Sequence, residues 1–168
     1  RKQIEAGDIT LDDIYSVHPF GNTMCVIRVT GQQVLDALEW GARAVPSENG
    51  GFLQVSGLTY EIHTGVASSA EKDENGMFTR VSGEYRVKNV MVGGQPLELD
   101  KTYTLASHNY MLLGHGDGYT MFDGCEVLGE DMMVDNQVLI TYITTTLGGV
   151  VGEQYANPYG DGRIVAVE

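Results

Sequence analysis

A glycine-rich segment in the second half of the chain carries the residues best suited to hold a small ligand. Gly114-His115-Gly116-Asp117-Gly118-Tyr119 follows closely on His108-Asn109-Tyr110. Three glycines within five residues permit positive φ angles and a close approach of the backbone to a ligand. Asp117 would accept hydrogen bonds either from sugar hydroxyls or from backbone N–H groups in an Asx turn. Tyr110, four positions before Gly114, offers a stacking surface.

A second candidate is Pro19-Phe20-Gly21-Asn22, which reads as a turn before a strand. Gly21 lets the backbone turn without a Cβ clash. Phe20 would serve either as a core residue, which is the commoner role of a phenylalanine, or as part of a ligand site.

Several common catalytic patterns are missing from the sequence. No Gly-Lys-Ser/Thr follows the glycines, so they do not form a P-loop, and their spacing departs from the dinucleotide fingerprint. There is no GxSxG nucleophile elbow. The adjacent acids Asp12-Asp13 and Glu130-Asp131 are typical of solvated surface, and nothing assembles a two-metal centre. The histidines lack metal-ligand spacing, which favours structural or solvated roles for His18, His63, His108 and His115.

Composition excludes further classes of protein. The 168 residues suffice for one domain with a core, and 42% hydrophobic and 20% charged residues are ordinary for a globular protein. A formal net charge of −13 makes nucleic-acid binding by a basic groove unfavourable. Any anionic ligand must therefore meet a local arginine. Cys25 and Cys125 are distant in sequence, which favours two separate thiols over a disulfide or a zinc site. No apolar run reaches the length of a membrane span, and no signal peptide is present.

The elements that must position these residues follow from hydrophobic spacing. A short helix is expected at 10–14 with Thr10 as N-cap, and a strand at 23–29. A helix capped by Thr30 is expected through Arg43 because its apolar residues share one face. A second helix is expected at 134–147, with Asp135 as a plausible cap.

Further strands are expected at 52–64, with a break at Gly57, and at 85–92, 97–107 and 162–167. A turn at Asn75-Gly76 would close an exposed hairpin, and 110–122 would form a glycine-rich loop. Strands outnumber helices and short turns join most of them. The predicted fold class is therefore α+β, with mixed sheets on which helices pack, rather than a doubly wound parallel sheet.

Several short motifs, in their order and spacing, resemble the C-terminal domain of the 5'-nucleotidase family, which includes UDP-sugar hydrolases and 2',3'-cyclic-nucleotide phosphodiesterases. Each motif alone is weak, but together they run nearly the full length of the chain. They are Arg1 with Ile4 and 6–10, 17–22, 29–31, 51–57, 101–103, Asn109-Tyr110, 116–119 and 162–164.

In that family the domain holds a nucleoside whose base lies between two aromatic rings. The resemblance implies that Phe20 and Tyr110 are these rings and that Asp117 accepts hydrogen bonds from the ribose hydroxyls. It also implies that Arg1 contacts the phosphate and that Asn22 and Gly51 lie near the base. Stacking contributes about 1–3 kcal/mol per base and tolerates different bases, and a guanidinium binds phosphate in a bidentate fork.

By the same resemblance, residues 1–168 form a single domain truncated at its N-terminal end, without the N-terminal metallophosphoesterase domain. In the family that domain carries two divalent metal ions, which generate the attacking hydroxide. The chain itself would then hold no catalytic residue, metal or cofactor. Its implied partners are a nucleotide or nucleoside and the N-terminal domain, and its implied location is extracytoplasmic.

The expected function is therefore nucleotide recognition within a metal-dependent phosphohydrolase. The alternative is a non-catalytic nucleotide- or surface-binding module with the same fold. Nucleoside monophosphates, cyclic nucleotides and UDP-sugars all fit the resemblance. A third possibility, a protein-interaction domain that uses its acidic face, has no specific motif.

Overall fold

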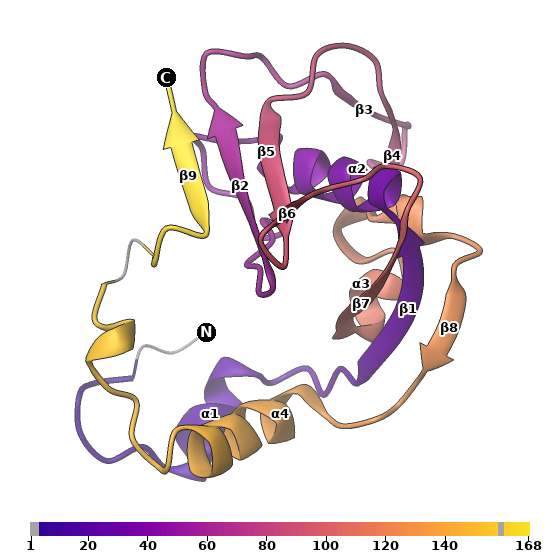
Figure 1. Cartoon of the computed structure of the whole chain (residues 1–168). Coiled ribbons are helices and arrows are strands. Elements are labelled where there is room, and N and C mark those ends of the chain that lie inside the picture. The colour runs from indigo at the N-terminus through magenta and orange to yellow at the C-terminus, as the bar shows by residue number, and fades with distance from the viewer. Residues whose placement is uncertain (1–3, 158–159) are drawn as a thin grey trace.

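One buried helix, α2 (Gly31–Ala42), lies between two β-sheets in the computed structural model, which describes residues 4–157 and 160–168 (Figure 1). Within these residues the first sheet has the strand order β7-β1-β8 and the second has the order β6-β5-β2-β9. The pairs are antiparallel except for β2 with β9, and β3 with β4 forms a separate hairpin. The strands are β1 Met24–Thr30, β2 Leu58–His63, β3 Ala70–Lys72, β4 Phe78–Val81, β5 Val87–Val92, β6 Gln95–Pro96, β7 Thr102–His108, β8 Glu126–Gly129 and β9 Ile164–Val167.

Helix α2 is fixed at its start by a capping box and along its length by burial. The Thr30 hydroxyl accepts a hydrogen bond from the Gln33 N–H at 3.2 Å, and Gln33 Oε1 accepts one from the Thr30 N–H at 2.8 Å. Trp40 is only 1% exposed, and its ring meets Phe78 edge to face. The buried carboxylate of Glu39 accepts a hydrogen bond from the Val87 N–H at 2.9 Å, which fastens the helix to β5. Burial raises the pKa of Glu39.

The register between β1 and β7 places the start of one strand beside the end of the other. Seven residue pairs align, from Met24 with His108 to Thr30 with Thr102. The short helix α3 (Asn109–Leu112) follows β7 directly. Segment 18–23, which leads into β1, therefore lies at the same end of the sheet as α3.

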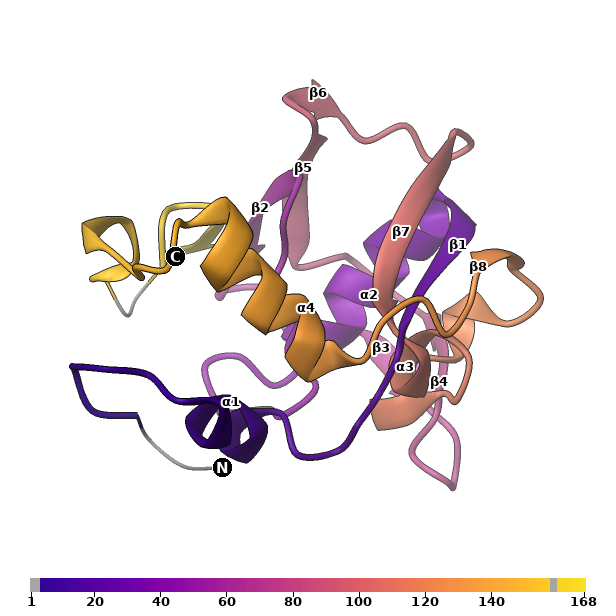
Figure 2. The same ribbon diagram turned by 90° about the horizontal axis from the view of Figure 1, so that it is seen from below.

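Helices α1 (Leu11–Val17) and α4 (Asp135–Thr141) pack on each other and form a separate layer, seen best in Figure 2. A π-helical turn at Tyr142–Thr146 extends α4. The layer joins the first sheet where the Asp135 N–H donates to the Asn22 carbonyl at 2.8 Å and the Met24 N–H to the Met133 carbonyl at 2.7 Å. No residue of α4 is buried, and Ile14 is the buried residue of α1.

The α+β fold class is confirmed, as are the helices capped by Thr10 and Thr30, the first and last strands, and the turn at Asn75-Gly76. Both cysteines are free thiols, as expected. No helix of the described residues is long and apolar enough to cross a membrane.

Three predicted elements were wrong in part. Residues 52–57 do not belong to a strand, because their backbone meets no partner strand before β2 begins at Leu58. The strand expected at 97–107 begins only at Thr102, because residues 97–101 form a turn in which the Lys101 N–H donates to the Glu98 carbonyl. Val134, not Asp135, is the N-cap of α4, and Asp135 lies in its first turn. Strand β8 was not predicted.

Candidate functional site

The Tyr110 ring lies flat against the backbone of the glycine loop. A Cβ atom added to Gly116 would stand 2.2 Å from Cε1 of Tyr110, so only glycine leaves room for the ring in this position. The ring is nevertheless 48% exposed. One face is thus supported by backbone while part of the ring remains open, which is the arrangement a stacking platform requires.

Asp117 and Gly51 meet beside this platform. A Cβ atom on Gly51 would lie 2.9 Å from Cβ of Asp117, so the two residues are in contact. Asp117 has a left-handed backbone conformation with φ 55°, which a short polar side chain tolerates. Its carbonyl accepts a hydrogen bond from the indole N–H of Trp40 at 2.9 Å, and its side chain is exposed. The carboxylate is therefore held by the core and presented to solvent.

Gly51 is held from the other side by Tyr119. The buried Tyr119 hydroxyl donates to the Gly51 carbonyl at 2.5 Å. The Asn49 side chain accepts from the Gly51 N–H and donates to the Gly41 carbonyl, both at 3.2 Å. The structure thus brings together Gly51, Tyr110 and Asp117, three of the residues predicted from the sequence.

Phe20 and Asn22 belong to the segment between α1 and β1. The Phe20 ring is 71% exposed, and Gly21 beside it has φ 67°. Asn22 is half-buried, and its carbonyl accepts the hydrogen bond from Asp135 that joins the two layers. Arg1, the predicted phosphate contact, lies outside the described residues.

Asn109 connects this segment to the Tyr110 platform. Its side-chain oxygen accepts hydrogen bonds from the Thr23 N–H at 3.1 Å and from the Tyr110 N–H at 2.9 Å. Its own N–H donates to the Thr23 carbonyl at 2.8 Å. One amide side chain therefore links the residue before β1 to Tyr110, which follows β7. Sequence reasoning noted Asn109 as part of a motif but gave it no role.

His108 sits beneath the platform as the N-cap of α3. Its Nδ1 accepts a hydrogen bond from the Met111 N–H at 3.3 Å, and its ring lies 5.9 Å from the Tyr110 ring, centroid to centroid. Burial lowers the pKa of His108, although the charges of Asp135 and Asp117 oppose that shift. The neutral ring is the form that accepts the capping bond.

The described residue that supplies positive charge near Asp117 is Arg43. Its guanidinium lies 3.7 Å from the centroid of the Trp40 ring and donates to the Trp40 carbonyl at 2.6 Å. Partial burial lowers the pKa of Arg43, and the nearby Tyr119 and Asp117 oppose this. No pattern in the sequence predicted this contact, apart from the position of Arg43 at the end of the predicted helix.

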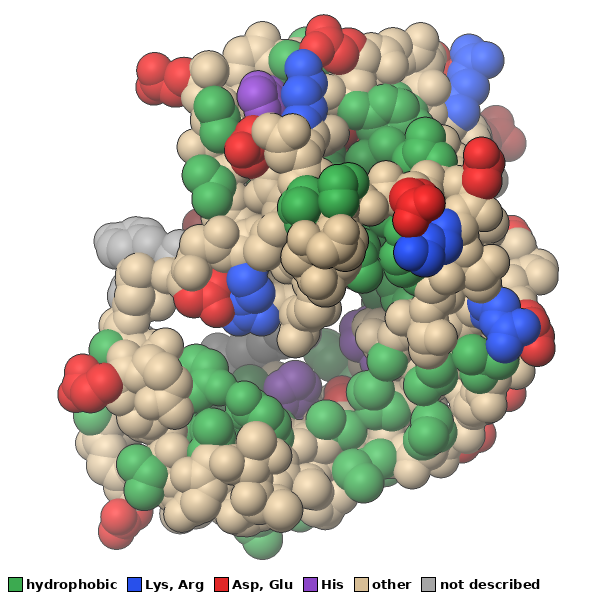
Figure 3. Space-filling model, viewed as in Figure 1, with side chains coloured by type: hydrophobic (Ala, Val, Ile, Leu, Met, Phe, Trp, Pro, Cys, Tyr) green, Lys and Arg blue, Asp and Glu red, His purple; other side chains and the backbone are tan. Residues whose placement is uncertain are grey.

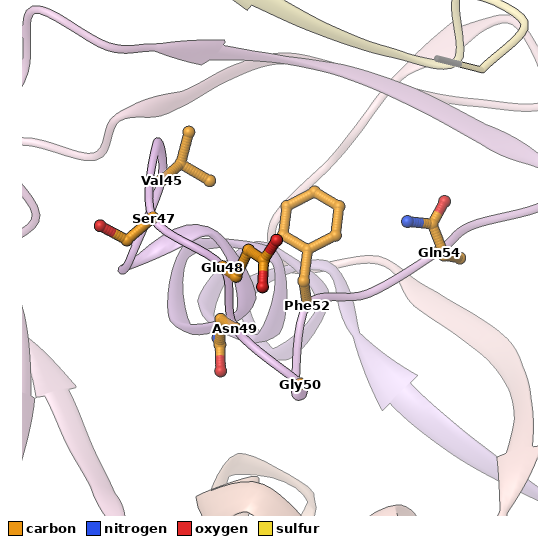
Figure 4. A pocket seen from close by; sticks show the side chains of 7 residues that line it. All are labelled: Val45, Ser47, Glu48, Asn49, Gly50, Phe52 and Gln54. Atoms are coloured by element: carbon orange, nitrogen blue, oxygen red, sulfur yellow. The ribbon is translucent and has the colours of Figure 1, made fainter. Parts of the chain in front are cut away.

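The surface is hollowed in two places. Figure 3 shows the molecule hollowed between the sheets and the α1–α4 layer, with histidine side chains at the rim. A second pocket lies in the loop after α2, where Figure 4 shows the Phe52 ring beside the Glu48 carboxylate and Asn49 pointing away. The second pocket includes none of the predicted site residues.

The described residues do not fit a metal centre. They include no group of three or more histidine, cysteine, aspartate or glutamate side chains placed to hold an ion. Instead, histidines pair with single carboxylates: His63 with Glu61 at 3.0 Å, His18 with Asp135 at 3.7 Å, and His115 with Asp123. The arrangement can stack, accept hydrogen bonds and orient a ligand, and no described group is placed to activate water on a metal.

Comparison with known proteins identifies the class of domain. The family described as "5'-nucleotidase, C-terminal domain" matches residues 1–124. The chain therefore belongs to the 5'-nucleotidase C-terminal domain family.

Individual relatives support this family assignment. The chain is 33% identical over 167 residues to the trifunctional nucleotide phosphoesterase protein YfkN of Bacillus subtilis. This alignment covers 99% of the chain and 10% of that protein. It is 32% identical over 143 residues to the 5'-nucleotidase of Vibrio cholerae, covering 85% of the chain and 22% of that protein. Among solved structures, a 5'-nucleotidase precursor from Thermus thermophilus aligns with a TM-score of 0.74 and 30% identity, covering 95% of this chain and 28% of that one. The chain thus spans a small part of each relative's length.

Proposed function

We propose that this domain recognises the nucleotide in an extracytoplasmic, metal-dependent phosphohydrolase of the 5'-nucleotidase type, which acts in nucleotide catabolism. The observation that carries the proposal is the exposed Tyr110 ring, seated on Gly116 and next to the exposed carboxylate of Asp117. A flat apolar surface beside a hydrogen-bond acceptor matches the two parts of a nucleoside, its base and its ribose.

In this proposal the base lies between the Tyr110 and Phe20 rings. Both rings are exposed, and Asn109 ties together the chain segments that carry them. Asn22 and Gly51 border the base, and the Asp117 carboxylate accepts hydrogen bonds from the ribose hydroxyls. Arg1 binds the phosphate.

Hydrolysis is assigned to a metallophosphoesterase domain elsewhere in the full-length protein, with two divalent metal ions. This assignment is supported by the lengths of the relatives named as nucleotidases, which are several times that of the chain. Names such as 5'-nucleotidase and nucleotide phosphoesterase support a phosphoric ester hydrolase as the parent protein.

The test is AMP binding by the full-length protein with single alanine substitutions, measured by calorimetry without turnover. Phe20→Ala and Tyr110→Ala should each weaken binding about tenfold or more, since stacking contributes about 1–3 kcal/mol. Tyr15→Ala is the matched control, because Tyr15 is 47% exposed on α1. If both site variants bind AMP as tightly as the parent, the stacking assignment fails. Binding without any hydrolysis in the presence of divalent metal would instead favour the non-catalytic module.

A further inference from the structure

The backbone around Asp117 rests on the ring of Trp40, the single tryptophan of the sequence. The indole N–H of Trp40 donates to the Asp117 carbonyl at 2.9 Å. A Cβ atom added to Gly118 would stand 2.9 Å from Cζ2 of Trp40, so the backbone after Asp117 also packs on the indole. The position of the Asp117 carboxylate therefore depends on the orientation of one aromatic ring.

The side chain of Arg43, the C-cap residue of α2, folds back over this ring. The central carbon of its guanidinium lies 3.7 Å from the centroid of the Trp40 ring, and its Nη1 group donates to the Trp40 carbonyl at 2.6 Å. A guanidinium stacks on an aromatic face through both its charge and its planar shape. Because the hydrogen bond to the Trp40 backbone keeps the guanidinium over the ring, Arg43 limits the orientations that the indole can adopt.

The charge of Arg43 also acts on Asp117. Burial lowers the pKa of Arg43, whereas Tyr119 and Asp117 raise it, so the Asp117 carboxylate lies within electrostatic reach of the guanidinium. Arg43 is half-buried, and attraction between unlike charges is screened less there than at an open surface. In a chain with a net charge of −13, this cation offsets the repulsion that the Asp117 carboxylate receives from the other acids.

Tyr119 connects the same helix end to Gly51. A Cβ atom on Gly41 would stand 2.9 Å from the Tyr119 hydroxyl oxygen, so this hydroxyl lies against the last turn of α2. The same hydroxyl donates to the Gly51 carbonyl at 2.5 Å. The end of α2 that Arg43 caps therefore supports both Gly51 and Asp117.

We propose that Arg43 is a positioning residue that determines how well this domain distinguishes a ribose from a sugar without hydroxyls. It fixes the Trp40 indole that holds the Asp117 backbone, and its charge draws the Asp117 carboxylate toward one orientation. This inference rests on the proposed function, which assigns Asp117 to the ribose hydroxyls. Arg43 acts through Trp40 and Asp117 rather than by touching the ligand, so its loss should weaken recognition of the sugar and spare that of the base.

The Trp40 indole N–H reports on this arrangement without any ligand, because the chain contains one tryptophan and gives one indole signal in an NMR spectrum. Hydrogen exchange of this N–H is compared among the parent 168-residue chain, Arg43→Met and the control Arg28→Met. Arg28 is a matched arginine, since it pairs with Glu126 at 2.7 Å on the surface.

Arg43→Met keeps an unbranched side chain but removes the charge and the planar group, so the indole N–H should exchange about tenfold faster or more. Arg28→Met should exchange as the parent does. Arg43→Lys should recover part of the loss, because it restores the charge without the planar group. An exchange rate in Arg43→Met equal to that of the parent would overturn the inference, as would a lysine variant that recovers nothing.

The second arm measures affinities for adenosine and 2',3'-dideoxyadenosine with the full-length protein. Arg43→Met should lower the ratio of the two affinities about threefold or more, through weaker binding of adenosine, while Arg28→Met leaves the ratio unchanged. An equal loss for both ligands in Arg43→Met would show a general structural role and overturn the inference.

Asp117→Asn, measured beside these variants, separates the inference from the proposed function. If Asp117→Asn lowers the ratio and Arg43→Met does not, the positioning role is wrong and the proposed function stands. If Asp117→Asn leaves the ratio unchanged, the assignment of Asp117 to the ribose fails, and the inference fails with it.

Discussion

The two sheets with α2 between them, called the body below, bury their side chains far more than the α1–α4 layer does. In the body, Trp40 and Tyr119 are each 1% exposed and both are hydrogen-bonded. In the layer, α4 buries no residue, and Tyr15 of α1 is 47% exposed.

The difference divides the candidate site in two. Tyr110, Asp117 and Gly51 rest on the body through Gly116, Trp40 and Tyr119, whereas Phe20 and Asn22 lie on the connection to the layer. One half of the site is therefore preorganised by the core. The other half depends on a few hydrogen bonds around Asn109 and Asp135.

The largest effect expected from this contrast is on stability. Trp40→Ala should lower the free energy of unfolding by about 3–5 kcal/mol, because it empties a buried site and frees the Asp117 carbonyl. Tyr15→Ala, on the layer, should cost less than about 1 kcal/mol. Urea unfolding of the 168-residue chain measures both. Equal costs would show that the layer is as firmly packed as the body.

A smaller effect is expected on binding when the platform itself is disturbed. Gly116→Ala would place a Cβ atom into the Tyr110 ring and displace it, so AMP affinity of the full-length protein should fall about tenfold. Gly65→Ala is the control, because a Cβ there meets no atom within 4 Å and its backbone is not left-handed. Unchanged affinity in Gly116→Ala would mean that the seated position of the ring does not matter for binding.

The smallest effect expected is a pH dependence of folding stability, and it tests the role of His108 next to Tyr110. Burial lowers the pKa of His108 below its unfolded value of about 6.5. As pH falls through that value, the unfolded chain takes up a proton that the folded chain does not, so this contribution to stability is lost on acidification.

The measurement is the free energy of unfolding at about pH 7.5 and 5.5 for the parent and for His108→Asn, which keeps an N-cap acceptor. The parent should lose more stability over this interval than the variant does. An equal or smaller loss in the parent would contradict the assignment of a neutral, buried ring.

Elements whose sequence signals lie within a few residues of each other could be predicted from local patterns alone. The N-caps Thr10 and Thr30, the apolar face of α2 and the turn at Asn75-Gly76 were all predicted correctly. Strand β8 was missed, and residues 52–57 were wrongly assigned to a strand, because strand formation depends on a partner distant in sequence.

The candidate residues show a similar division. Phe20, Tyr110 and Asp117 were selected from their motifs, and the structure finds all three exposed. Their supports could not be predicted, because the hydrogen bond from Trp40 to Asp117 spans 77 positions and the one from Tyr119 to Gly51 spans 68. Asn109, which joins the two halves of the site, acts through a side chain 86 positions from Thr23.

The central claim, that Asp117 holds the ribose of a stacked nucleoside, is tested most directly by a double-substitution cycle. Affinities for adenosine and 2',3'-dideoxyadenosine are measured with the parent full-length protein and with Asp117→Asn, which tolerates the left-handed backbone of this position. In the parent, loss of the two hydroxyls should weaken binding about tenfold or more, because charge-assisted hydrogen bonds are lost. In Asp117→Asn this penalty should shrink markedly. An identical penalty in both proteins would show that the ribose is held elsewhere and would contradict the account.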